Sequence, residues 1–344
     1  KINKSTEISG NFKTKKTKIN LKNYKKIINI NLDLIDDRPI DLSSDNNISF
    51  KINKKFKIED LSIISKLNFD ELFTKSKYQD LIYLNNGNIL INYTKEEFKI
   101  NLNSKFHFQN KNYNNKESEN LFKLIYKKKQ NKNALVNINL SNEKSKINSS
   151  EFKDFFRFKN FSLQDQDITF ASENIINFKL NETNKVQNFN IKSNIKTDNV
   201  LIDYKSQRVK KYFSNFKNQI KLTQSNFDID YSKNKFMIGL NSKYSINNIN
   251  DKLILNVEKK DNNYSFDVNL DLDSAEITVA ELDYKKNINI KSNLYINGLY
   301  KKNNEIIIEN LRYKEKEKQI LIQNLEIEKN DKIKNLDLIK INLV

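Results

Sequence analysis

Apolar and polar residues alternate along most of the chain, most clearly between residues 262 and 298. The alternating apolar positions there are Tyr264, Phe266, Val268, Leu270, Leu272, Ile288, Ile290, Leu294 and Ile296. Successive side chains of a β-strand point to opposite faces, so this stretch predicts strands with one apolar and one polar face. The functional question is therefore what the apolar face contacts.

The same alternation recurs through the rest of the chain and predicts an all-β protein. Strand-like runs follow one another at nearly the spacing of a meandering antiparallel sheet, which gives on the order of twenty strands. Two stretches depart from this pattern. The spacing of apolar residues from Leu61 to Phe73 is loosely helical, so residues 59–84 are predicted to hold a short helix or an irregular crossover. Ser141 to Ser150 is predicted to be a polar loop.

One amphipathic helix is predicted between Val209 and Ile220. Its apolar positions, which share one helical face, are Val209, Tyr212, Phe213, Phe216 and Ile220. We interpret this helix as an end cap that packs on the rim of a sheet.

Composition and charge change this picture little. The chain has 4 Gly and 1 Pro, so Asn, Asp and Lys take over the turns, and Asn tolerates the left-handed conformation. The excess of Lys, Asn and Ile is typical of an AT-rich coding background. We interpret the net charge of +18 as lysine on solvated strand faces, with an anionic partner as the alternative. Lysine is not gathered in one patch and no nucleic-acid motif accompanies it, which disfavours nucleic acid.

Residue clusters for catalysis or metal binding are missing from the sequence. With no Cys and His107 as the only histidine, a typical zinc site is excluded. Four glycines cannot build a nucleotide-binding loop. Asp271 and Asp273 share a strand face, but exposed carboxylates are common there. We predict no enzyme activity, no metal and no cofactor. No run of 18 or more apolar residues is present to form a spanning helix.

The apolar face must nevertheless be covered, because each Leu, Ile, Val or Phe left in water forfeits roughly 1.5–3 kcal/mol. A second sheet, closure into a barrel, or an apolar ligand in a partly curled sheet are the possible covers. An outer-membrane barrel is disfavoured, since aromatic girdles and Gly-rich turns are lacking.

A resemblance bears on this choice. Leu270 to Ile277 reads Leu-Asp-Leu-Asp-Ser-Ala-Glu-Ile and is followed by Leu282, Tyr284 and Lys285. This resembles a segment near the C-terminus of bacterial AsmA-like proteins of the YhdP/TamB type, where a Leu-Asp-Leu-Thr-Asp-Ala run leads into a Pro-x-Leu-x-Trp-x-Lys run. The resemblance extends upstream to the predicted helix from Val209 to Ile220. Residues 1–150 resemble the family only in their general sequence character and not in a motif. Ala280 stands where the family often has Pro, and Tyr284 where it often has Trp.

The resemblance implies a long antiparallel twisted sheet curled into an open hydrophobic groove, a β-taco-like fold with one or two short helices. It implies a periplasmic protein of a Gram-negative bacterium, anchored in the inner membrane by a segment outside this chain. Such a bridge-like protein would conduct phospholipids between the inner and outer membranes, with outer-membrane or periplasmic proteins as further partners. The residues expected to contact acyl chains are Phe227, Ile229, Phe236, Ile238, Leu240, Tyr264, Phe266, Val268, Leu270, Ile288, Ile290, Leu294 and Ile296.

The polar stretch from Asn110 to Asn120 is the best candidate boundary within the chain. It divides an N-terminal part of the groove, residues 1–115, from a C-terminal AsmA-like part, residues 116–344. Both are expected to belong to one continuous fragment of a longer protein. The alternative interpretation is a secreted or surface β-sandwich or solenoid that binds other proteins and holds no ligand.

Overall fold

The computed structural model describes residues 5–20, 38–73, 82–108, 120–130, 132–152, 161–246, 249–302, 305–328 and 332–343. Nineteen of its strands belong to one antiparallel sheet, and two short strands form a separate hairpin. Among the described residues, β1 (Thr6–Ile19) pairs only with β2 (Ile40–Ile52), and β21 (Leu338–Asn342) pairs only with β19 (Lys318–Ile327). The sheet is therefore open at these two strands, and the predicted all-β antiparallel class is confirmed.

The chain divides into two compact units. Unit 1 comprises Lys1–Ser145 and Ser172–Ile191, and unit 2 comprises Lys146–Ala171 and Lys192–Val344. The predicted boundary near residue 115 lies outside the described residues, and β5 (Glu97–Phe108) pairs with β6 (Leu121–Lys129) across it. Strands β7 (Ala134–Asn148), β9 (Asp167–Leu180) and β10 (Val186–Tyr204) each contain residues of both units.

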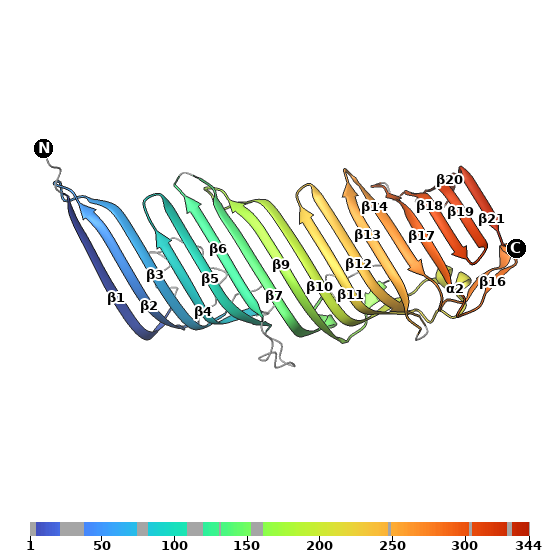
Figure 1. Ribbon diagram of the computed structural model, residues 1–344, viewed down its shortest axis with the longest axis horizontal. Coiled ribbons are helices and arrows are strands. Elements are labelled where there is room, and N and C mark those ends of the chain that lie inside the picture. The colour runs from blue at the N-terminus through green and yellow to red at the C-terminus, as the bar shows by residue number, and fades with distance from the viewer. Residues whose placement is uncertain are drawn as a thin grey trace. The chain divides into compact units, whose positions relative to one another are not determined.

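In unit 1, strands follow one another as sequential antiparallel neighbours (Figure 1). After β1 and β2 they are β3 (Ile58–Phe73), β4 (Ile82–Tyr93), β5 (Glu97–Phe108), β6 (Leu121–Lys129), β7 (Ala134–Asn148) and β9 (Asp167–Leu180).

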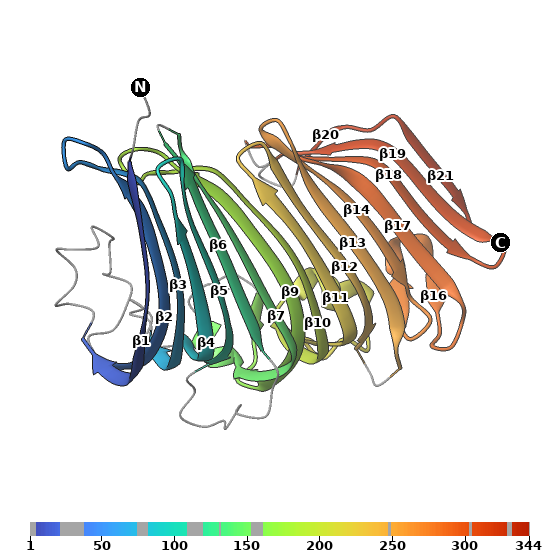
Figure 2. The ribbon, with the colours of Figure 1, turned by 60° about the vertical axis from the view of Figure 1, so that its left-hand side comes forward.

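Unit 2 repeats this arrangement and adds small elements at the ends of its strands (Figure 2). Its main strands are β10 (Val186–Tyr204), β11 (Gln219–Ser232), β12 (Lys235–Ser245), β13 (Asp251–Lys260), β14 (Asn263–Asp271), β17 (Ser292–Tyr300), β18 (Ile306–Glu315), β19 and β21. The small elements are η3 (Ser149–Phe152), β8 (Phe161–Leu163), α2 (Gln207–Tyr212), β15 (Ile277–Val279), η4 (Ala280–Leu282), β16 (Tyr284–Lys286) and β20 (Ile333–Asn335).

Bulges keep the apolar residues on one face where the alternation slips by one residue. In β4 the apolar positions change from even, at Leu84, to odd, at Ile89, and the register with β5 shifts between Asn85 and Asn88. Asn86 adopts a φ of 48° at that point. In β11 the same slip, from Leu222 to Phe227, coincides with a register shift that contains Gln224. An extra residue in one strand restores the facing of all the residues beyond it.

Several predicted elements differ from the structure. Residues 58–73 form strand β3, so the predicted helix or crossover is wrong there. The helical spacing arose because Ile64 lies on the polar face, paired with Asn47 and Asn92. The predicted loop Ser141–Ser150 is mostly strand, since β7 continues to Asn148. The alternation of Ile28, Ile30, Leu32 and Leu34 predicts a further strand, which lies outside the described residues.

The predicted helix is confirmed only in its first turn, from Val209 to Tyr212. Helix α2 ends at Tyr212, and its N-terminus is capped by Ser206, whose hydroxyl accepts a hydrogen bond from the Val209 backbone N–H (3.3 Å). Beyond it, Phe213 forms a β-bridge with Ile277 and Phe216 is buried. Phe213 also packs against the cluster that covers the end of the sheet, in agreement with an end cap.

Candidate functional site: the apolar face of the sheet

Strand register in unit 2 aligns the apolar residues into continuous rows across the strands. One row passes from Phe227 through Leu240, Leu255, Val268, Ile296, Leu311 and Ile322 to Ile339. A second passes from Ile229 through Ile238, Val257, Phe266, Gly298 and Ile308 to Leu325. A third joins Leu253, Leu270, Leu294, Tyr313, Ile320 and Ile341. Because paired residues share a face, these rows form one apolar surface.

Eleven of the sequence-predicted residues lie on this surface; Ile288 and Ile290 do not. Both isoleucines precede β17 in a turn, where Asn289 has a φ of 61° and its N–H bonds to the Asp273 carbonyl (2.8 Å). Ile288 is 45% exposed. The prediction that these two residues continue the alternation of β17 is therefore wrong. The polar residues around them allow a turn that the alternation alone does not reveal.

Exposure along the apolar surface of unit 2 is graded. Residues at one end of the strands are buried in two clusters, which include Leu222 and Tyr244 in one and Leu272 and Tyr313 in the other. In the middle rows, Ile238, Phe266, Val268 and Ile296 are partly exposed, while Leu240 retains 8% exposure. At the other end Tyr264 is 39% exposed. The surface is thus covered at one end and accessible at the other.

Unit 1 has an apolar surface of the same kind. Leu67, Ile89, Leu102, Leu124 and Ile138 form one row across β3 to β7. Its buried cluster consists of Ile40, Phe69, Leu84 and Phe106, all from strands. Most other positions, such as Ile100 and Leu124, are partly exposed.

A buried polar network holds the covered end of unit 2. The Lys286 side chain is fully buried, and its ammonium donates to the carbonyl oxygens of Ala275 (2.8 Å) and Asn287 (3.2 Å). Burial lowers the pKa of this lysine. The network fixes the turn that follows β14 to the strand that precedes β17.

Two tyrosines and a glutamate complete this network. The Tyr284 hydroxyl donates to the Glu315 carboxylate and lies 2.8 Å from the Tyr313 hydroxyl. Burial, followed by the hydrogen bond to Glu315, raises the pKa of Tyr284 far above its ordinary value. Burial also raises the pKa of Tyr313, to about 12. Both tyrosines therefore stay neutral and serve as hydrogen-bonding groups at ordinary pH.

Aromatic residues and a lysine occupy the accessible end of each apolar surface. In unit 2, Tyr264 pairs with Lys259 on one side and Tyr300 on the other, and the Phe236 ring meets the Tyr264 ring at 6.0 Å. In unit 1, Phe98 pairs with Tyr93 and Lys128, and its ring meets the Tyr126 ring at 5.9 Å.

Sequence reasoning missed the lysines Lys128 and Lys259 because it treated lysine as a solvated residue throughout. A signal was present, however. Lys259 continues the apolar alternation of Leu253, Leu255 and Val257, and Lys128 continues that of Leu124 and Tyr126.

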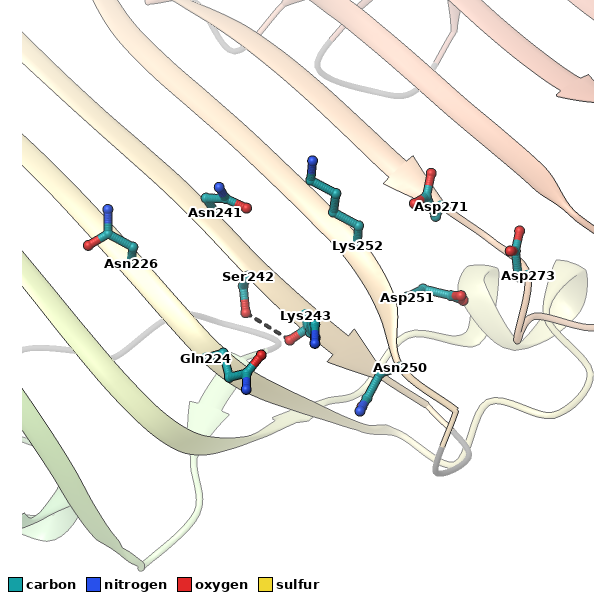
Figure 3. A pocket seen from close by; sticks show the side chains of 10 residues that line it. All are labelled: Gln224, Asn226, Asn241, Ser242, Lys243, Asn250, Asp251, Lys252, Asp271 and Asp273. Carbon is teal, nitrogen blue, oxygen red and sulfur yellow. Dashed lines mark hydrogen bonds between the residues drawn. The ribbon is translucent and has the colours of Figure 1, made fainter.

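The polar face of unit 2 contains a pocket of about 360 Å³ (Figure 3). Asp251, Asp271 and Asp273 lie on one side of it, and Lys243 and Gln224 on the other. Each carboxylate accepts a hydrogen bond: Asp251 from the Ser274 N–H (2.9 Å), Asp271 from the Asn293 amide (3.0 Å) and Asp273 from the Ser292 N–H (2.8 Å). In the described part of the chain, no group of three or more His, Cys, Asp or Glu is arranged to hold a metal ion.

His107 lies in strand β5 and is buried. Its ring stacks on Tyr83 at 5.2 Å, Tyr83 stacks on Phe73, and the Arg38 guanidinium lies 3.5 Å from the Phe73 ring centre. This aromatic stack lies on the polar face of unit 1, opposite Leu84 and Phe106.

No family model, curated protein or solved structure matches the chain. Among the described residues, no helix combines the length and the apolar character that crossing a bilayer requires.

Proposed function

We propose that this chain is a section of a bridge-like lipid-transfer protein whose apolar sheet face forms a groove for phospholipid acyl chains. Phospholipids would move along this face between the inner and outer membranes of a Gram-negative bacterium. The protein would act in the periplasm, anchored in the inner membrane, together with outer-membrane or periplasmic partners. Its mechanism is solvation of acyl chains and involves no catalytic step.

The observation that carries this proposal is the continuity of partly exposed apolar rows. Each row places an apolar residue on strand after strand, so that an acyl chain could pass from one strand to the next without meeting a charge. Each such side chain left in water forfeits roughly 1.5–3 kcal/mol relative to burial. An apolar ligand on the middle rows recovers part of that free energy. The compartment, the two membranes and the identity of the lipid rest on the resemblance to AsmA-like proteins.

A charge placed in the middle of the face tests this function. Val268→Asp and Leu294→Asp would each interrupt a row, and a desolvated carboxylate there costs several kcal/mol. Asn269→Asp is the matched control, because it adds the same charge one residue away on the opposite face, where Asn269 accepts a bond from Asn293 (2.6 Å).

Phospholipid that co-purifies with the protein, and transfer of fluorescent phospholipid between vesicles, would be measured for the three variants. We expect both to fall strongly for Val268→Asp and Leu294→Asp and to persist for Asn269→Asp. Transfer that survives both charged variants in folded protein would contradict the proposal, as would wild-type protein that neither carries nor transfers lipid.

The exposed edge strands favour a second candidate, an interaction scaffold without ligand. Nearly every residue of β1 and every residue of β21 is exposed, and within the described residues each of these strands pairs on one side only. Such edges can add a strand from another polypeptide. Lipid-free wild-type protein that binds an extended peptide at these edges would favour this function over lipid transfer.

A further inference from the structure

Lys259 is a cationic residue on the apolar face of strand β13. It follows Leu253, Leu255 and Val257 on the same face of β13 and pairs with Tyr264 of β14. Within the described residues, the side chain of Lys259 has no ion pair or hydrogen bond, although the residue is partly buried. A lysine that only needed solvent would be better placed on the polar face.

Unit 1 repeats this combination with different residues. Lys128 follows Phe122, Leu124 and Tyr126 on the apolar face of β6 and pairs with Phe98, which in turn pairs with Tyr93. Lys128 is exposed and, in the part of the chain that the structure describes, also has no ion pair. In both units the lysine lies at the end of the strands opposite the buried cluster.

The distance between this end and the buried end limits what the face can hold. Six residues separate Tyr264 from Leu270, which packs against both buried clusters of unit 2. At about 3.3 Å per residue this is roughly 20 Å. Half of the hydrocarbon core of a bilayer is about 15 Å. An acyl chain as long as half of a bilayer core therefore fits between the aromatic residues at the accessible end and the buried clusters at the covered end.

We propose, on the basis of the proposed function, that Lys259 and Lys128 each bind the phosphate of a phospholipid headgroup and thereby orient the lipid. The ammonium group pairs with the phosphate, and the neighbouring rings of Tyr264 and Phe98 contact the glycerol region, where an amphipathic environment is required. The acyl chains then extend along the strands toward the buried cluster. The apolar face is thus polarised, with a headgroup end and a tail end in each unit.

Charge reversal separates headgroup recognition from tail binding. The double variant Lys128→Glu/Lys259→Glu would be tested with phosphatidylglycerol and with diacylglycerol, each labelled at the end of one acyl chain. The matched control is Lys123→Glu/Lys314→Glu, which makes the same charge change at exposed lysines on the polar face. Because a charge-assisted hydrogen bond is lost at each site, we expect phosphatidylglycerol binding to weaken by about tenfold and diacylglycerol binding to stay unchanged.

Equal weakening for both lipids, or unchanged phosphatidylglycerol binding, would overturn the headgroup role and return both lysines to ordinary solvated residues. A control double variant that loses phosphatidylglycerol binding to the same degree would also overturn it, since the effect would then follow net charge alone. If wild-type protein binds neither lipid, the lipid-transfer function itself fails. The two failures are therefore distinguishable.

Fluorescence tests the orientation separately, because the chain contains no tryptophan. Tyr264→Trp places a single fluorophore at the headgroup end, and Leu270→Trp places one at the tail end, with Leu253→Trp as a substitute if Leu270→Trp does not fold. Phosphatidylcholine carrying a spin label on its headgroup should quench the headgroup-end tryptophan at least twofold more than the tail-end tryptophan. A spin label at the end of the acyl chain should reverse that order. Equal quenching at both positions, or the opposite order, would overturn the orientation.

Discussion

The two units share the apolar rows and the aromatic end, and they differ in how the other end is covered. In unit 1 the buried cluster forms among strand residues alone, from Ile40 to Phe106. In unit 2 the turn after β14 and the two-stranded hairpin contribute Ala275, Ile277 and Tyr284 to one of the two clusters, and Phe213, which follows helix α2, packs against it. Features that recur in both units belong to the proposed ligand face. The cover present in unit 2 alone serves the stability of that end.

A glycine under an aromatic ring is a further shared feature. Phe69 pairs with Gly87 in unit 1, and Phe266 pairs with Gly298 in unit 2. At Gly87 a Cβ atom would overlap the ring of Phe69, whereas at Gly298 it would overlap the backbone carbonyl oxygen of Ile307. The first obstacle is a side chain and the second is backbone, so the two sites should respond differently to the same substitution.

The largest effect is expected from breaking the cover of unit 2. Lys286→Ala removes a buried ammonium and leaves the carbonyls of Ala275 and Asn287 without their donor, which should destabilise this end by about 3 kcal/mol or more. Hydrogen exchange should show faster exchange in β14 to β18 and unchanged exchange in β3 to β6.

Lys285→Ala is the control for this substitution. Lys285 is exposed, and in the described part of the chain its ammonium forms a surface ion pair with Glu276 (3.3 Å), so its loss should change stability little. A Lys286→Ala variant as stable as this control would contradict the role of the buried network.

The glycine pair should give the next largest effects. Gly298→Ala is expected to destabilise by about 3 kcal/mol, because strand β18 must shift, and Gly87→Ala by about 1–2 kcal/mol. Phe69→Leu should partly rescue Gly87→Ala by removing the obstructing ring, and Phe266→Leu should not rescue Gly298→Ala. Urea unfolding of the single and double variants would measure these differences, and equal rescue at both sites would refute the distinction.

The smallest effect concerns pH. Burial raises the pKa of the Asp251 carboxyl above its ordinary value of 3.8, against two hydrogen bonds from Ser274 that lower it. The stability that this group contributes is therefore fully present below its ordinary pKa and is lost as pH rises through the raised pKa. Asp251→Asn should remove this component, so that the variant gains stability relative to the wild type as pH increases from 4 to 7. A difference between the two proteins that does not change with pH would contradict this assignment.

Sequence alternation predicted the antiparallel all-β class and most strands, because the period of two is imposed directly by strand geometry. It failed where apolar residues lie on the polar face, as at Ile64, and where a turn interrupts the pattern, as at Ile288. It also could not reveal that a strand as long as β10 is continuous. Where the apolar positions shift by one residue within a strand, the sequence pattern resembles the end of one strand and the start of another. The Lys286 network was not predicted, because it joins three backbone carbonyls whose approach depends on tertiary folding.

Pairing between neighbours in sequence has a consequence for how such a chain can change in length. Strands β2 to β6, β12 and β13 each bond to the strands immediately before and after them. A duplicated or deleted hairpin would thus alter only its two boundaries and leave every other register intact. Evolution could fit the span of such a sheet to a wider or narrower gap one hairpin at a time, at little thermodynamic penalty.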